Sequence, residues 1–198
     1  MARKQQEKSL QTQRELLESA EKLFAAKGFV ATTVAEITSD AGYAKGNFYR
    51  HWQSKDEIML AIIADKMQSY RAMRDAALRD ARSLEEVMDR ILDFLDTMID
   101  DRNWSSVFLE FTIHASRNED LRAQLNQSLY RLSDEISDDI VAPYVKSGYP
   151  APKIGALNTA LFEGFLIHSL LGTGTIDRTD FRRAAMKLAL ANALDDQE

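Results

Sequence analysis

Residues 32–52 of the chain read TTVAEITSDAGYAKGNFYRHW, and this stretch decides the fold. Thr33 and Glu36 have the spacing of a capping box, in which the Thr side chain accepts from the backbone N–H three residues on and the Glu side chain reaches back. A short helix should follow, and Gly42 can supply the left-handed residue that ends it. A further short helix is predicted over about residues 44–52. Two short helices around a tight glycine turn are the elements of a helix-turn-helix.

The rest of the chain shows the same helical pattern. Apolar residues recur at spacings of three and four, which is typical of a helix with one buried face. The sequence contains only three prolines and eight glycines, so few residues interrupt such helices. The predicted helices outside the motif cover about residues 9–27, a long segment that opens at residue 54, and residues 84–99, 103–114, 118–142, 153–171 and 179–194. We therefore expect an all-α fold of about nine helices.

The charge of the chain is unevenly distributed. The formal net charge is −6, yet residues 1–55 carry nine Lys or Arg against six Asp or Glu. The remainder carries 16 basic and 25 acidic residues. A basic head on an acidic body indicates that only the head meets a polyanion.

Several classes of protein are disfavoured by what the sequence lacks. It contains no cysteine, so disulfides, thiolate metal sites and cysteine nucleophiles are excluded. His51, His114 and His168 are scattered, and neither a metal-ligand spacing nor a glycine-rich phosphate loop accompanies them. We expect no metal, no cofactor and no enzymatic activity. Residues 1–10 do not have the pattern of a signal peptide, and no run of about 18 apolar residues predicts a membrane span. A cytoplasmic location fits this composition.

The head resembles the DNA-binding domain of the TetR family of transcriptional regulators. Gly42, Gly46, Tyr49, His51 and Trp52 match the family pattern in order and spacing, as do Gly28-Phe29, Thr32–Ile37 and Lys55. The similar stretch covers about Leu10–Ile62. Ala44 stands where the family often has Ser or Thr, and Trp52 replaces a commoner Phe. The resemblance implies a three-helix DNA-binding domain over residues 1–54 and a ligand-sensing and dimerisation domain over residues 55–198.

The first residues of the second motif helix are the candidates for reading bases. Lys45 can donate to guanine and Asn47 can bond adenine bidentately. Gly46 has no side chain, which would let the helix backbone approach DNA closely, or it serves only the tight turn. Arg50 is expected to reach a phosphate or a base, or to be solvated. Phe48 is more often a core residue, although an aromatic edge can rest on a thymine methyl.

Phosphate contacts are implied mainly by the family resemblance. It assigns Tyr49, His51 and Lys55 to phosphates. Thr33 opens the first motif helix, and the N-terminus of that helix would offer a further contact. Phosphate contacts set the register of a protein on DNA and carry no sequence information, so these residues do not reveal the operator.

The last two predicted helices are the candidates for a dimer interface. Small residues at a spacing of four make a smooth face on which another helix can pack closely, and the alternative is that this face packs within one subunit. In the family, the last two helices of each subunit form a four-helix bundle. The residues concerned are Ala156, Ala160 and Gly164 in one helix and Ala184, Ala185 and Leu188 in the next.

The body is rich in large apolar side chains with a few polar groups among them. Such a composition suits a pocket for a lipophilic or aromatic effector, and the family fold implies a cavity there. The alternative for each residue is ordinary core packing. The candidates are Phe94, Met98, Trp104, Phe108, Phe111, His114, Phe162, Phe165 and His168.

These interpretations together predict a TetR-type regulator. It would be a homodimeric repressor, released from a palindromic double-stranded DNA operator when a small effector binds the C-terminal domain. The alternative function is a helical protein-interaction module that keeps the fold without binding DNA. Binding to duplex DNA that falls with salt would separate the two.

Overall fold

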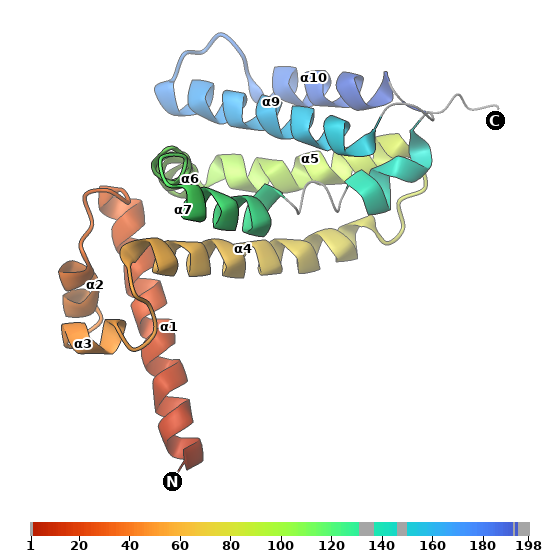
Figure 1. Ribbon diagram of the computed structural model, residues 1–198. Coiled ribbons are helices and arrows are strands. Elements are labelled where there is room, and N and C mark those ends of the chain that lie inside the picture. Colours follow the sequence, from red (N-terminus) through yellow and green to blue (C-terminus); the bar gives the residue numbers. More distant parts are fainter. Residues whose placement is uncertain (1, 131–136, 146–149, 192, 194–198) are drawn as a thin grey trace. The chain divides into compact units, whose positions relative to one another are not determined.

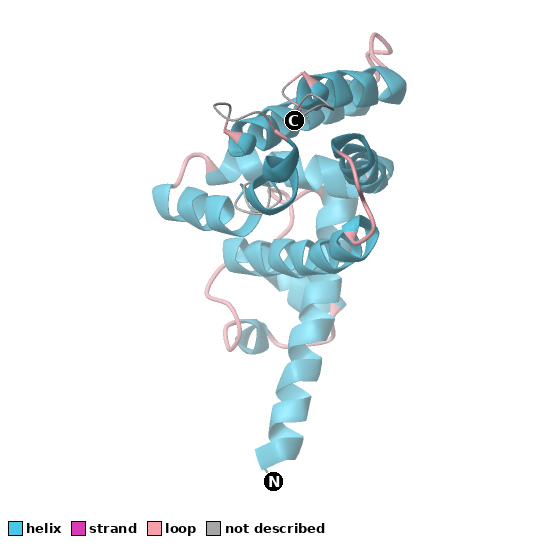
Figure 2. Cartoon of the chain, turned by 90° about the vertical axis from the view of Figure 1, so that its right-hand side faces the viewer, coloured by secondary structure: helices cyan, strands magenta, loops and turns pink. Residues whose placement is uncertain are grey.

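The structure is a computed structural model that describes residues 2–130, 137–145, 150–191 and 193. The regular elements in these ranges are helices (Figures 1 and 2), which confirms the all-α prediction. The long and short α-helices are α1 (Ala2–Lys27), α2 (Val34–Asp40), α3 (Lys45–Phe48), α4 (Lys55–Leu78), α5 (Leu84–Asp100), α6 (Arg102–Ala115), α7 (Glu119–Leu125), α9 (Ala151–Leu171) and α10 (Arg178–Leu190). Two π-helical segments, η1 (Asn126–Tyr130) and η2 (Ser137–Val141), and a 3-10 turn, η3 (Ala142–Tyr144), complete them.

The chain forms two compact units. The head unit contains the residues up to Lys66 together with Ser106–Leu125. The body unit contains Met67–Ser105 and the residues from Asn126 onward. The sequence suggested a division after residue 54, whereas the compact units divide within α4 and within α6. Each of these two helices therefore runs from one unit into the other.

Local capping signals explain several helix ends. The Thr33 side chain accepts from the Glu36 N–H and Glu36 accepts from the Thr33 N–H, so the predicted capping box is present. Gly42 has a φ of 76°, the left-handed conformation expected for it. Ser83 caps α5, and Asn118 accepts from the Leu121 N–H at 3.0 Å as α7 opens.

Several predicted helix boundaries differ from the structure. The helix α1 begins at Ala2 rather than near residue 9, and α10 ends at Leu190 rather than near residue 194. The regular part of α3 ends at Phe48, before the predicted end near residue 52, and the chain then tightens, with the His51 N–H donating to the Phe48 carbonyl at 2.9 Å. Asp101 caps α6 by accepting from the Trp104 N–H at 3.0 Å, so α6 begins at Arg102, one residue before the predicted start.

The helix predicted from Asn118 to about residue 142 is also shorter than expected. Regular α-helix ends at Leu125, and the π-helical segment η1 follows. Residues 131–136 of that prediction lie outside the described residues.

The core of the head unit lies where α1, α2 and α3 meet. Its fully buried side chains include Leu16, Phe24, Phe29, Ile37 and Phe48. The Ser19 hydroxyl fixes α1 to the end of α2, since it lies 2.9 Å from the Ile37 carbonyl and 2.9 Å from an Asp40 carboxylate oxygen. This small core is what holds the two motif helices at a fixed angle.

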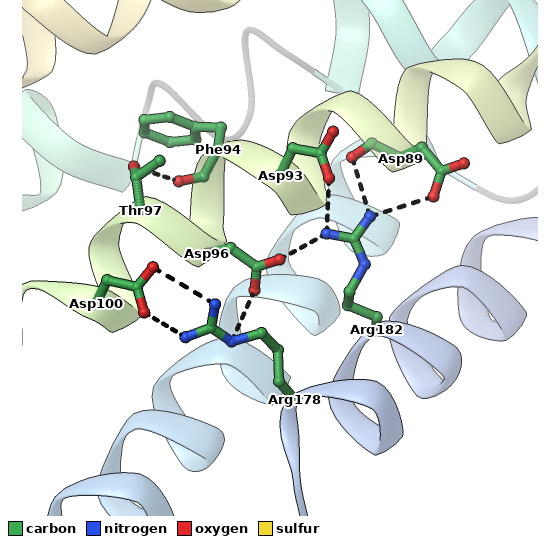
Figure 3. Close-up of polar contacts among 8 residues, drawn as sticks. All are labelled: Asp89, Asp93, Phe94, Asp96, Thr97, Asp100, Arg178 and Arg182. Atoms are coloured by element: carbon green, nitrogen blue, oxygen red, sulfur yellow. Dashed lines mark hydrogen bonds and ion pairs between the residues drawn. The ribbon is translucent and has the colours of Figure 1, made fainter.

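A ladder of ion pairs joins α5 to α10 in the body unit (Figure 3). Asp89, Asp93, Asp96 and Asp100 recur at spacings of three and four, which places them on one face of α5. Arg182 reaches Asp93 at 2.9 Å and Asp96 at 2.7 Å, and it lies 3.3 Å from Asp89. Arg178 reaches Asp100 at 2.5 Å. Opposite charges thus hold α10 against α5. On α10, Phe181 also stacks on Phe165 of α9.

One face of α9 is apolar and exposed. Leu157, Leu161, Ile167 and Leu171 are 43%, 38%, 48% and 75% exposed. By length and composition α9 is also the one helix among the described residues that is apolar enough to cross a membrane, with 22% of its most apolar window buried. No span was predicted from the sequence, because polar residues interrupt this segment. One such helix is weak evidence of a membrane, since a core or interface helix of a soluble protein passes the same test.

Candidate nucleic-acid interface and effector region

The exposed surface of α3 and of the turn that follows it is mostly polar. Lys45, Gly46, Tyr49 and Arg50 are exposed, and Tyr49 is the most apolar of them at 51% exposure. The Lys45 ammonium lies 5.9 Å from the centre of the Tyr49 ring, close enough for a cation–π contact. Asn47 is half-buried beside them. The structure thus brings together most of the residues predicted to face DNA.

Phe48 anchors this face from beneath. Its side chain is completely buried, and its ring centre lies 5.6 Å from that of Trp52. The alternative prediction that Phe48 rests on a thymine methyl is therefore not supported, because the ring is enclosed by the core of the head unit. His51 is half-buried with its ring 5.5 Å from Trp52.

Neither the backbone conformation nor a close contact within the protein requires glycine at position 46. Its φ is not positive, unlike that of Gly42, so the backbone does not require glycine for a left-handed turn. A Cβ added there would meet nothing within 4 Å. The interpretation of Gly46 as an adaptation to a tight turn therefore loses its basis, and close approach of the helix backbone to DNA stays a prediction.

The N-terminus of α2 already holds a carboxylate. Glu36 accepts from both the N–H and the hydroxyl of Thr33 at 2.9 Å, and its other oxygen lies 2.6 Å from the Lys27 ammonium. Lys27 and Thr33 together lower the pKa of Glu36 to about 2. A phosphate that approached Thr33 would meet this ionised side chain, so Thr33 does not offer an open anion site in the free protein.

Lys55 is engaged inside the head unit. Its ammonium donates to the carbonyls of Phe29, Val30 and Thr32 at 2.6, 3.0 and 2.8 Å and lies 4.4 Å from the Phe29 ring centre. These bonds use the three donors of an ammonium. Burial lowers the pKa of Lys55, while nearby carboxylates oppose that shift. The predicted phosphate contact of Lys55 would require this ammonium to leave its carbonyls.

Glu110, which was not singled out from the sequence, holds the turn between α1 and α2. Its carboxylate accepts from the Phe29 N–H at 2.8 Å and the Val30 N–H at 2.9 Å. Glycine is required beside it at position 28, where φ is 86° and a Cβ would lie only 2.8 Å from the Glu110 carboxylate. In the sequence, Glu110 stands out only as the one carboxylate of α6, among apolar neighbours. No short-range rule connects it to residue 29.

His114 also belongs to this junction. Its Nε2 lies 2.8 Å from an Asp56 carboxylate oxygen, and its ring centre is 5.1 Å from that of Phe29. Phe111 packs edge-on against the same Phe29 ring at 4.9 Å. These contacts support the alternative weighed for His114, a hydrogen-bonded packing residue, and they occur within the head unit.

The nine residues predicted to line an effector pocket fall in two units. Phe108, Phe111 and His114 belong to the head unit and the other six to the body unit. Met98, Trp104, Phe162 and Phe165 are buried, whereas Phe94 is half-buried with its ring 4.7 Å from that of Tyr70.

His168 lies apart from those buried rings. It is exposed on α9, and its Nδ1 lies 2.8 Å from the Thr173 hydroxyl just beyond the helix. It is thus placed as a surface residue near the end of α9 rather than as a buried polar anchor.

The comparisons with known proteins agree with this geometry. The fold is that of a helix-turn-helix protein with an all-helical body. Residues 16–62 match the family described as bacterial regulatory proteins, tetR family. This match places the helix-turn-helix segment of the chain, residues 16–62, in the TetR family of transcriptional regulators.

Individual relatives match mainly over the N-terminal part. The HTH-type transcriptional repressor KstR2 of Rhodococcus jostii (strain RHA1) is 35% identical over 86 residues, which are 41% of this chain and 42% of that protein. The matched segments span between 16% and 57% of the lengths of the first curated relatives.

Solved structures match over nearly the whole chain. FadR of Bacillus subtilis, solved in complex with stearoyl-CoA, has a TM-score of 0.74 at 17% identity and covers 90% of this chain and 97% of its own. A transcriptional regulator from Saccharomonospora viridis, solved with choline, has a TM-score of 0.73 at 21% identity and covers 93% of this chain and 98% of its own. At such low identity these structures show the fold alone.

Proposed function

We propose that this chain is a DNA-binding transcriptional regulator that inserts α3 into the major groove of an operator. The observation that carries the proposal is the exposed polar face of α3, built on the buried Phe48 ring and containing an unobstructed glycine at position 46. In a helix-turn-helix the second helix enters the groove and its first residues meet the base edges.

The residues of α3 and of the turn that follows it take roles that their chemistry allows. Lys45 and Asn47 read bases, and Gly46 lets the helix backbone come close to the groove. Tyr49 and His51 donate to phosphates, and Arg50 serves either target. Lys22 and Lys27 of α1 pair with Asp40 and Glu36 at 2.6 Å, whereas Lys45 and Arg50 have no ion pair among the described residues.

The regulator acts as a homodimer through α9 and α10. The exposed apolar stripe of α9 supports this, because Leu157, Leu161, Ile167 and Leu171 lie on the same side as the small residues at 156 and 160. A monomer would leave this stripe in water, and a second copy of the same helix would cover it. Two heads related by a twofold axis would then read half-sites of a palindromic operator about one helical turn apart.

The body unit binds a small lipophilic or aromatic effector that releases the repressor from DNA in the cytoplasm. The buried rings of Trp104, Phe162 and Phe165 with Met98 support an apolar site. The stearoyl-CoA and choline bound by two proteins of similar fold support ligand binding as a use of this architecture.

The helices α4 and α6 carry the coupling, because each is continuous from the body unit into the head unit. A differential affinity of roughly 1–3 kcal/mol between the two forms of the protein would weaken operator binding about 5- to 150-fold.

The experiment that tests DNA binding compares two variants of α3 with a control. Duplexes enriched from a random library by the parent protein serve as the probe, and fluorescence anisotropy measures Kd. Lys45→Ala should cost about 1–3 kcal/mol if it reads a base, and Tyr49→Phe should weaken binding to all sequences alike.

Lys22→Ala is the matched control, since Lys22 is also an exposed head lysine but lies on α1 and pairs with Asp40. Unchanged Kd values for both α3 variants would show that the interface is misassigned. Absence of salt-sensitive binding to any duplex would favour the protein-interaction alternative.

The effector and the dimer are tested together by native mass spectrometry of the purified protein. A dimer has twice the 22.4 kDa chain mass, and any additional mass gives the mass of a co-purified ligand. A chain that stays monomeric at micromolar concentration contradicts the two-headed mechanism.

A further inference from the structure

The N-terminal part of α1 projects beyond the folded core of the head unit. The first buried residue of the helix is Leu16, and residues 4–11 are all exposed. Figure 1 shows α1 continuing past α3 toward its N-terminal end. Leu10, which is 56% exposed, is the one large apolar residue of this part, so the helix has no apolar stripe here to bury within its own unit. The stability of the head unit therefore does not explain why residues 4–14, which we call the projecting segment, form a helix beyond its core.

The excess positive charge of residues 1–55 lies at this end. Residues 2–14 carry four basic residues and one acidic residue, whereas residues 15–55 carry five of each. The helix-turn-helix proper is thus neutral overall. A polyanion that approaches the head is attracted mainly by the projecting segment together with the accessible cations of α3.

Two of these cations point to the side on which α3 lies. Lys4, Lys8, Gln11 and Glu15 recur at spacings of three and four and so share one face of α1. The last of them, Glu15, accepts a hydrogen bond from the hydroxyl of Tyr43, which lies two residues before the start of α3. The face that carries both lysines is therefore the face turned toward the start of α3. Neither Lys4 nor Lys8 has an ion-pair partner among the described residues.

The reach of the segment suits a duplex held by α3. Lys4 precedes Glu15 by eleven positions, which at 1.5 Å a residue places it about 16 Å along the helix axis. The major groove is about 12 Å wide, so a helix of this reach can extend from a groove occupied by α3 to the phosphates that border it.

We propose that Lys4 and Lys8 form a second DNA-contact surface, binding backbone phosphates next to the groove that α3 enters. The inference rests on the proposed function and adds to it a sequence-independent clamp outside the helix-turn-helix. Its ligand is the phosphate backbone of duplex DNA. Arg14 belongs to the same segment but lies on a different face of α1, so it takes no part.

The test uses the full-length protein and a labelled mixed-sequence duplex of about 40 base pairs. Phosphate binding is independent of sequence, so no operator is needed, and Kd is measured by anisotropy between about 50 and 200 mM salt. Each phosphate contact contributes about 0.9 to the slope of log K against log salt. The K4Q/K8Q variant should lose about 1.8 of that slope for each head bound. Between the two salt concentrations the parent should then lose roughly 12-fold more affinity per head than the variant.

Three controls separate a clamp from a general loss of charge. K4R/K8R keeps both charges and should keep the slope of the parent. R14Q removes a cation from the other face of the same segment and should leave the slope unchanged. R79Q/R82Q removes two exposed cations from the body unit and matches the charge change of K4Q/K8Q.

The outcomes are distinct. A parent-like slope for K4Q/K8Q overturns the clamp while leaving the proposed function in place, and so does an equal loss in R79Q/R82Q. A loss in R14Q as large as that of a single lysine overturns the assignment to one face. A parent protein that binds no duplex overturns both proposals.

Discussion

Replacing Glu110 by Ala should destabilise the head unit through the turn that joins α1 and α2. Glu110 accepts from two backbone N–H groups, those of Phe29 and Val30, across 80 residues of sequence. In the Ala variant no side chain remains to accept from them. The turn also carries the carbonyls that Lys55 binds, so its loosening affects the start of α4 as well.

The magnitude follows from the surroundings of the two N–H groups. The Phe29 N–H is partly buried, so losing its charged acceptor should cost about 1–3 kcal/mol. The Val30 N–H is exposed and can bond to water instead, which makes its loss small. We expect a total of about 1.5–3 kcal/mol, which for a chain of this size corresponds to a fall in Tm of roughly 3–12 °C.

Thermal unfolding and amide hydrogen exchange measure this effect at two levels. The exchange of the Phe29 and Val30 amides should accelerate in E110A more than that of amides in α5. E110Q keeps one neutral acceptor and should fall between E110A and the parent. E18A is the control, because Glu18 is an exposed carboxylate on α1. A Tm for E110A within about 1 °C of the parent, with unchanged exchange at both amides, would refute the reasoning.

Three further predictions concern the capping box, the α9 stripe and the ion-pair ladder. Glu36, whose pKa is lowered to about 2 mainly by Lys27, adds stability that is complete above its ordinary pKa of 4.5 and lost as the pH falls toward 2. The Tm difference between the parent and E36Q should therefore shrink over that interval, and a constant difference would contradict the lowered pKa. Leu161→Lys should shift the protein to monomer in native mass spectra, whereas an unchanged dimer would place the interface elsewhere. Arg182→Gln should cost about 1–2 kcal/mol at low salt by leaving half-buried Asp96 short of a partner, and less at about 1 M salt, where charges are screened within about 3 Å. Urea unfolding at both salt concentrations measures it, and a salt-independent difference would argue against an electrostatic ladder.

The sequence was informative where the signal is local. The helix-turn-helix could be recognised because Thr33, Glu36 and Gly42 act through bonds and dihedral angles within a few residues of themselves. The same holds for the caps at Ser83 and Asn118. Apolar periodicity marked the helices of the body for a similar reason, since each buried face is encoded within its own segment.

The tertiary structure decided what depends on distant partners. Lys55 was expected to face a phosphate, yet it binds carbonyls that lie more than 20 residues earlier in the chain. The sequence left Phe48 undecided between a core position and a contact with DNA. The structure shows its ring buried against that of Trp52. Glu110 and Arg182 gave no local signal of their roles, because their partners are roughly 80 or more residues away.

The sequence by itself thus determined the helical class, the position of the recognition helix and the family. The tertiary structure decided which charges are free to meet DNA and which are already bound within the head. The physical reason is that capping and periodicity act between neighbours in the chain, whereas burial and ion pairing depend on which segments meet in space.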